Sequence, residues 1–215
     1  MKELRYTLLT DGSSDRALLP LLTWLLREHG VNFPIQSEWA DLRRLPKPPK
    51  ELSERIKWSI ELYPCDLLFV HRDAETGSLA SRVEEIHKAL EQLAGAIHWN
   101  RDLTVCVIPI RMQEAWLLLN EAAIRSAAGN PNGRRPLELP SIKDLEQLPN
   151  PKMVLFNLLR QASELYGRRL RSFRVSGRVQ RVAEFINDFV LLRALSAFVA
   201  LEEEIEQVVR KQGWV

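Results

Sequence analysis

Acidic residues follow three strand-like apolar segments of this sequence, each at the point where the segment ends. Asp11 follows residues 5–10, Asp73 and Glu75 follow residues 65–71, and Glu114 follows residues 103–110. In open α/β sheets, ligands bind beyond the carboxyl ends of parallel strands. Gathered carboxylates repel one another unless a cation lies between them, and hard oxygen ligands suit Mg²⁺ or Mn²⁺. The sequence therefore predicts a divalent-cation site at one edge of a sheet.

Each of these acidic residues also has an ordinary structural explanation. Asp11 precedes a glycine and can shape a turn, whereas Asp73 and Glu75 lie in a loop before a predicted helix. Glu114 falls in the first turn of a predicted helix, where the helix dipole favours negative charge, and Asp15 is interpreted as another helix-start residue. The recurrence of acidic residues after three successive segments favours the metal site over these separate explanations.

The first half of the chain alternates between strand and helix patterns. Strand patterns lie at 5–10, 33–40, 65–71 and 103–110, and amphipathic helical patterns lie between Ser14 and Gly30, at 51–62 and at 79–94. Repeated strand–helix units of this length need crossover connections. The predicted fold class is therefore α/β, with a mostly parallel, Rossmann-like sheet and helices on both of its faces.

From Gln113 onward the pattern is helical. Helices are predicted at 114–128, 151–166, 178–199 and 200–212, the last two either separate or continuous. The segment 129–151 carries five prolines, which is typical of a long loop or lid. We expect an α/β domain at 1–128, a proline-rich loop at 129–150 and a helical subdomain at 151–215 that packs on the core.

Length and composition bound the class of protein. The chain has 215 residues, of which 46% are hydrophobic and 27% charged, as in an ordinary globular domain with or without an appended subdomain. It has no apolar run of the ~18 residues that a membrane span needs, and no secretory signal pattern. Cys65 and Cys106 form no CxxC pattern, which argues against a thiolate zinc site. These features predict a cytoplasmic protein without membrane contact.

Arginine is the dominant cation of the sequence and is unevenly distributed. The net charge is only +2, but seven arginines lie between Arg160 and Arg181, where Glu164 is the one acidic residue. Arginine suits bidentate contacts with phosphate, so a polyanion is one interpretation. A solvated helix face is the other. His71 adjoins the acidic cluster and can contact a phosphate or metal, or serve as a structural histidine. Neither a GxxxxGK[ST] loop nor a GxSxG elbow is present.

At these motifs the sequence resembles the Toprim-like fold of topoisomerases, primases and overcoming-lysogenization-defect nucleases. It is most similar to uncharacterised bacterial Toprim-like proteins that often occur beside ATPases in defence loci. The resemblance rests on LLTDGSSDRALLPLL, LLFVHRDAE and IPIRMQEAWLL, with support from NPKMVLFNLL and INDFVLLRALSAFVALEEEI, and so covers most of the chain.

The resemblance implies roles for individual residues. Asp11 stands where the family has a glutamate that acts in general acid/base chemistry, and Asp73-Ala74-Glu75 stands where the family has a magnesium-binding DxD. Asp11, Asp73 and Glu75 are thus the implied catalytic and metal-binding residues, with Glu114 as a further ligand. Both departures change side-chain reach by one methylene, which puts catalytic competence in question. The cationic residues suggested for phosphate contacts are Arg72, Arg111, Arg168, Arg169 and Arg171.

The expected function is metal-dependent hydrolysis of nucleic-acid phosphodiesters, in a defence or DNA-repair system, with Mg²⁺ or Mn²⁺ as cofactor. The first alternative is a catalytically weak or inactive module that binds nucleic acid and acts with a partner ATPase. The second is a small-molecule phosphotransferase or phosphatase that uses the same acidic edge. The third is a purely structural interaction protein. The sequence does not determine whether the substrate is DNA or RNA, whether cleavage is sequence-specific, or what the oligomeric state is.

Overall fold

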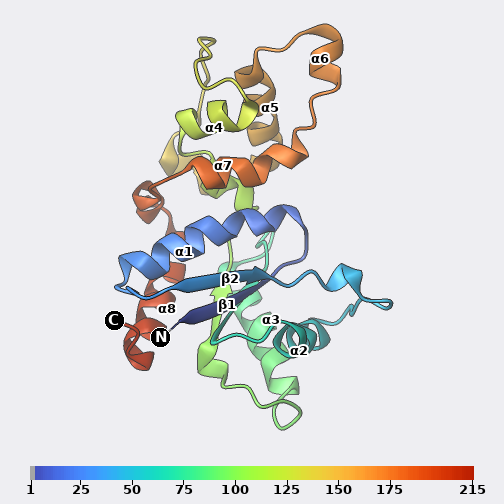
Figure 1. Cartoon of the computed structure of the whole chain (residues 1–215), viewed down its shortest axis with the longest axis vertical. Helices are drawn as coiled ribbons and strands as arrows, with labels where there is room; N and C mark the ends of the chain where they lie inside the picture. The colour runs from blue at the N-terminus through green and yellow to red at the C-terminus, as the bar shows by residue number, and fades with distance from the viewer. Residues whose placement is uncertain (1–2) are drawn as a thin grey trace.

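The chain forms a four-stranded, entirely parallel sheet in a computed structural model that describes residues 3–215 (Figure 1). Its strands are β1 (Leu4–Leu9), β2 (Ile35–Trp39), β3 (Leu67–His71) and β4 (Thr104–Val107). The order across the sheet is β2-β1-β3-β4. In register, Tyr6 of β1 pairs with Ser37 of β2 and with Leu67 of β3. The predicted α/β class and parallel sheet are confirmed.

The strand order places a topological switch point between β1 and β3. From the central strand β1 the chain crosses first to β2 on one side and then returns to β3 on the other. The carboxyl ends of β1 and β3 are therefore adjacent, while the connections that leave them run in opposite directions. Ligands of open α/β sheets bind in the crevice that this arrangement creates.

Helices cover both faces of the sheet. On one face, α1 (Leu19–Glu28) packs on a core that includes Tyr6, Leu8 and Phe69. On the other face, α2 (Leu52–Leu62) and α3 (Leu79–Gln92) enclose a second core around Leu68 and Val70 of β3. All five β3 residues are buried, because a central strand with a helical layer on each side is shielded from water on both faces.

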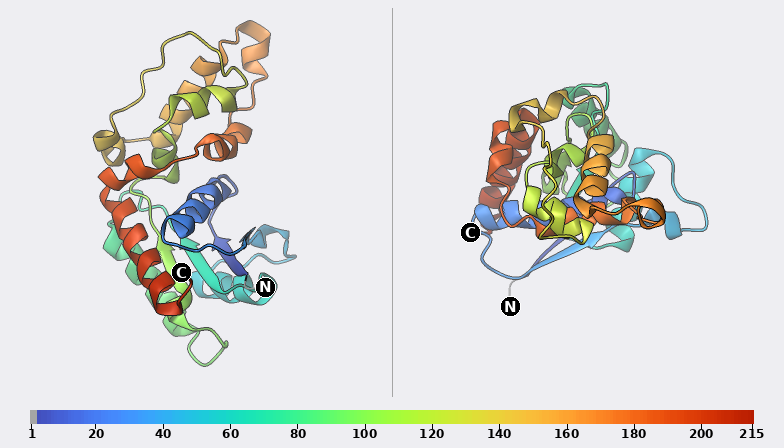
Figure 2. Two further views of the ribbon diagram at one scale, coloured as in Figure 1. Left: turned by 60° about the vertical axis from the view of Figure 1, so that its left-hand side comes forward. Right: turned by 90° about the horizontal axis from the view of Figure 1, so that it is seen from above.

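The remaining helices extend the first core beyond α1. They are α4 (Glu121–Ala128), α5 (Pro151–Ser163), α6 (Gly167–Arg171), α7 (Val179–Phe185) and α8 (Ser196–Gln212). In Figure 1, α7 lies between α1 and the α4–α5 pair, and α6 lies at the end farthest from the sheet. The last helix, α8, returns to contact α1 and the edge strand β4 (Figure 2). No helix within residues 3–215 is long and apolar enough to cross a membrane.

Several predicted helices are interrupted at identifiable residues. The predicted helix 114–128 consists of a 3-10 turn, Gln113–Leu117, and then α4, whose first turn is capped by Asn120. The Asn120 side chain accepts a hydrogen bond from the Ala123 N–H at 2.9 Å, which favours a new helix start there. The predicted helix 178–199 is broken, because α7 ends at Phe185 and a 3-10 turn, Val190–Ala194, precedes α8. Across the predicted junction of residues 199 and 200 the helix is continuous, since α8 runs from Ser196 to Gln212.

Candidate functional site

The carboxyl ends of β1, β3 and β4 carry the acidic residues to one edge of the sheet. The loop after β1 supplies Asp11 and Asp15, the last residue of β3 is His71, and Asp73 follows two residues later. Glu114 lies in the 3-10 turn that follows β4. The parallel sheet therefore delivers these side chains to the switch point.

Asp11 is held in an ion-pair cluster with two arginines. Its carboxylate accepts hydrogen bonds from Arg55 of α2 and from the Arg72 guanidinium, whose Nη1 lies 2.9 Å from both carboxylate oxygens. Arg72 also pairs with Glu85 of α3 at 2.9 Å. Burial raises the pKa of Asp11, but the hydrogen bond from Arg55 and the charges of both arginines outweigh burial and lower it. A carboxyl with a lowered pKa is poorly matched to general acid/base chemistry near neutral pH.

His71 lies between two carboxylates and is almost completely buried. Its Nε2 lies 3.2 Å from the Asp73 Oδ1, and its Nδ1 lies 3.6 Å from the Asp15 Oδ2. Burial lowers the pKa of His71, but the hydrogen bond with Asp73 and the charges of Asp73, Asp15 and Asp11 raise it above its usual value overall. The carboxylates of Asp15 and Asp73 therefore favour the protonated form of the imidazole at this edge.

Glu114 completes the buried acidic group, with an exposed fraction of only 3%. Burial raises the pKa of Glu114, and the negative charges of Asp73 and Asp15 raise it further, although Lys152 opposes the shift. The Lys152 Nζ lies 3.8 Å from the Glu114 carboxylate. The buried carboxylates Asp15 and Glu114 and the partly buried Asp73 thus lie close enough to repel one another.

Glu75 lies outside this group. Its side chain is exposed and its closest charged partner is Arg82, at 3.8 Å. The backbone of Glu75 has a positive φ of 52°, and its N–H donates to the Arg111 carbonyl at 3.1 Å. This turn links the loop after β3 to the loop after β4. The structure therefore brings together Asp73 and Glu114 of the predicted ligands, adds Asp15, and leaves Glu75 apart.

The predicted phosphate-binding arginines are also divided. Arg72 belongs to the site through Asp11, whereas Arg111 donates from its Nη1 to the Glu75 carbonyl at 3.4 Å. Arg168, Arg169 and Arg171 are exposed on α6, with α5 and α7 between them and the sheet (Figure 1). The charge density of the sequence could not distinguish arginines at the strand ends from those at the far end of the helical part.

Sequence analysis missed or discounted four residues that the fold brings to this edge. They are Asp15, Arg55, His71 and Lys152. As a helix-start residue Asp15 accepts the Gly12 N–H and the Ser14 hydroxyl, each at 2.9 Å, but its carboxylate also faces His71. Only its position four residues after Asp11 could have signalled a role. Arg55 and Lys152 come from helices that the sequence gives no reason to associate with β1 or β4.

The donor chemistry fits a hard divalent cation, although the side chains as they lie form no finished ligand set. Carboxylate oxygens of Asp15, Asp73 and Glu114 are the ligands that Mg²⁺ and Mn²⁺ prefer. The buried amide of Gln113 has no hydrogen-bond partner for either polar atom within residues 3–215. In the same range, no group of three or more His, Cys, Asp or Glu side chains is already placed to hold a metal ion. Asp15 and Asp73 are instead directed to His71.

Comparison with known proteins adds no identification. No family model, no curated protein and no solved structure matches this chain.

Proposed function

We propose that this protein is a metal-dependent phosphodiesterase that acts on nucleic acid, with a Toprim-like site at the carboxyl ends of β1, β3 and β4. The observation that carries the proposal is the pairing of Asp15 and Asp73 with buried His71 at the switch point of the sheet, with the buried Glu114 close enough to both carboxylates to be repelled by them. Buried like-charged groups are costly for stability and concentrate where chemistry requires them.

This edge carries a group of carboxylates and, next to it, a group of arginines. The carboxylates suit a metal cation, and the arginines suit the phosphate that the cation would bind. Asp15, Asp73 and Glu114 would hold Mg²⁺ or Mn²⁺, which would polarise a phosphodiester and lower the pKa of an attacking water. Arg55 and Arg72 now neutralise Asp11, and both present guanidinium groups that can bind phosphate oxygens instead. Lys152 adds a third cation next to Glu114.

In this scheme Asp11 and His71 position other groups. Asp11 fixes the direction of the Arg55 and Arg72 guanidinium groups, because it binds both of them. His71 orients the carboxylate of Asp73, which also accepts the Gln113 N–H at 2.9 Å. When a cation binds the carboxylates, the imidazole loses the charge that now holds its proton, so we expect metal binding and protonation of His71 to oppose each other.

The test is cleavage of single-stranded DNA, duplex DNA and RNA in Mg²⁺ or Mn²⁺, with chelation by EDTA as one control. Asp73→Asn keeps the shape of the side chain but removes its charge, and we expect activity to fall about 100-fold or more. Glu84→Gln is the matched control, because Glu84 pairs with Lys88 on the exposed face of α3. A wild-type protein that cleaves none of these substrates with either metal would refute the proposal.

Two observations favour a second candidate function, a catalytically weak binding module. Asp11 is already neutralised by two arginines, and no finished ligand set exists among residues 3–215. Under this proposal the edge binds nucleic acid without cutting it and serves a partner ATPase, as the resemblance in sequence implies. Binding that persists in EDTA, combined with no cleavage in either metal, would favour this function.

A further inference from the structure

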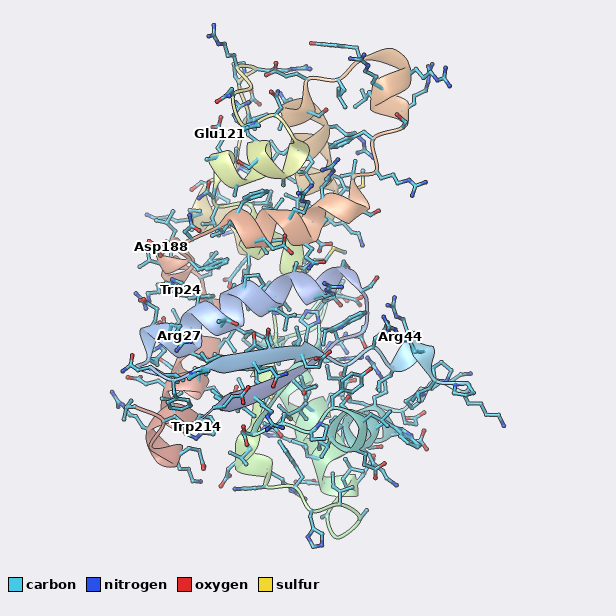
Figure 3. All side chains as sticks on the ribbon, viewed as in Figure 1. Trp24, Arg27, Arg44, Glu121, Asp188 and Trp214 are labelled. Carbon is cyan, nitrogen blue, oxygen red and sulfur yellow. The ribbon has the colours of Figure 1, made fainter. Side chains whose placement is uncertain are left out.

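A cationic hollow of about 600 Å³ lies beside the acidic edge, between the α/β part and the helical part of the molecule. It is lined from the loop after β1, from the segment after β2, from α5 and from the turn before α7. The residues that matter here are Arg16, Trp39, Arg43, Arg44, Lys152 and Phe156. Figure 3 shows Arg44 on the segment that follows β2, at the side of the molecule to which the strands point.

The hollow carries an excess of positive charge. Four of its lining side chains are cationic, and Asp41 is its one acidic residue. Asp41 accepts hydrogen bonds from the Nε atoms of Arg43 at 2.7 Å and Arg44 at 3.1 Å, so one carboxylate is shared between two guanidinium groups. Arg16 has no carboxylate within ion-pair distance among residues 3–215, and its side chain is exposed. Lys152 faces the Glu114 carboxylate at 3.8 Å, so two positive charges remain for a ligand.

Aromatic rings hold these cations over the hollow. The guanidinium carbon of Arg43 lies 5.0 Å from the Trp39 ring centroid, and that of Arg16 lies 5.9 Å from it. The Trp39 Nε1–H donates to the Thr10 hydroxyl at 2.9 Å, which ties the ring to the carboxyl end of β1. On the opposite wall, the Lys152 Nζ lies 5.9 Å from the Phe156 ring centroid. Alternating rings and cations suit a ligand that is both anionic and aromatic.

The hollow leads to the acidic edge at two points. Lys152 lines it and also reaches the Glu114 carboxylate. A second hollow of about 240 Å³ shares Trp39, Asp41 and Arg43 with the first, and is lined further on by Asp11 and Arg55. A chain bound along both hollows would pass Asp11 with its arginine pair.

We propose that this hollow binds an unpaired nucleic-acid strand and presents it to the edge of the sheet, so that the substrate class is single-stranded DNA or RNA. This inference rests on the proposed function. A recess of this size can enclose a nucleotide or two, with phosphates against the arginines and a base near Trp39 or Phe156. In a duplex the bases are already paired and stacked and cannot enter the recess.

The test measures binding apart from cleavage, with the full chain in EDTA. The probe is a fluorescently labelled oligothymidylate of ~12 nucleotides, within the range that single-strand sites occupy, and anisotropy is followed over a series of salt concentrations. We compare the double variant Arg16→Gln/Arg43→Gln with Arg101→Gln/Arg210→Gln. The control removes the same charge from exposed arginines that do not line either hollow. A hairpin duplex of equal length serves as the competing probe.

We expect the hollow variant to bind the single strand about 10- to 100-fold more weakly, and the control to bind within about twofold of wild type. The slope of log affinity against log salt should fall by about 1.4, because each lost phosphate contact contributes about 0.7 for a single strand. Equal losses in both double variants would overturn the proposal, as would equal or tighter binding of the hairpin or no binding by wild type. If binding follows the expectation but wild type cleaves nothing in Mg²⁺ or Mn²⁺, the hollow stands and the nuclease proposal fails.

Discussion

Glu204 offers a quantitative test of how α8 is fixed to the sheet. The Glu204 carboxylate accepts the backbone N–H of Cys106 in the edge strand β4 at 3.1 Å. Burial between the helix and the strand raises the pKa of Glu204 to about 7, although the hydrogen bond from Cys106 lowers it somewhat. We therefore expect Glu204→Gln, which keeps the acceptor oxygen but cannot ionise, to stabilise the protein at alkaline pH.

The sign and size follow from proton linkage. In the unfolded chain the Glu204 carboxyl ionises with its ordinary pKa of 4.5, whereas in the folded chain its pKa is about 7. Between these values only the folded state binds the proton, so wild-type stability falls by about 1.4 kcal/mol per pH unit. Over the whole window the loss is about 3 kcal/mol, an upper limit because the side chain is partly open to solvent.

The assay is urea unfolding of wild type, Glu204→Gln and the control Glu203→Gln at a series of pH values from 4 to 8.5. Glu203 is exposed on the same helix, so its substitution removes a similar charge without the contact to β4. At pH 8 we expect the midpoint of Glu204→Gln to exceed that of wild type by about 1 M, since unfolding slopes are about 2 to 3 kcal/mol per molar urea. The advantage should vanish near pH 4. A pH-independent difference, or a less stable variant at pH 8, would refute the reasoning.

Three further predictions concern the site and the core. Glu114→Gln should lower the initial rate of metal-dependent cleavage about 100-fold, and Glu75→Gln should lower it much less. A larger loss in Glu75→Gln than in Glu114→Gln would favour the ligand set that the resemblance implies. Gln113→Met should raise the free energy of unfolding by about 1 to 2 kcal/mol in urea, because neither polar atom of the buried amide has a protein partner. Tyr6→Phe should lower it by about 1 to 2 kcal/mol, because the Tyr6 hydroxyl bonds to the Leu19 carbonyl at 2.8 Å; an unchanged midpoint would contradict this.

The sheet was predictable because its strands are coded locally. The segments 65–71 and 103–110 are continuous apolar runs, as strands covered on both faces require, and they contain β3 and β4. The helix ends were less predictable, because they depend on single polar side chains. For example, α3 begins at Leu79 because the Ser78 side chain accepts the Ser81 N–H at 3.1 Å.

The sequence predicted which residues lie at the strand ends but not which side chains contact one another there. Local sequence determines where a strand ends, whereas tertiary packing determines the partners of a side chain. The placement of Asp11, Asp73 and Glu114 at one edge followed from three strand ends and the parallel rule. The separation of Glu75 from Asp73 did not, since it results from a turn in which Glu75 has a positive φ. Two carboxylates that lie two residues apart in sequence can be expected to bind the same metal ion only when the backbone between them is regular.

The distribution of unsatisfied polar groups supports a functional role for this edge. Within residues 3–215, seven buried side-chain nitrogen and oxygen atoms have no hydrogen-bond partner. Four of them belong to His71, Arg72 and Gln113, which lie at or beside the ends of β3 and β4. Each such atom costs about 1 to 3 kcal/mol, and the repelling carboxylates near Glu114 add to that cost. A chain selected for stability alone would fill this edge with apolar side chains, and under the proposed function a bound phosphate and cation would offset part of the cost.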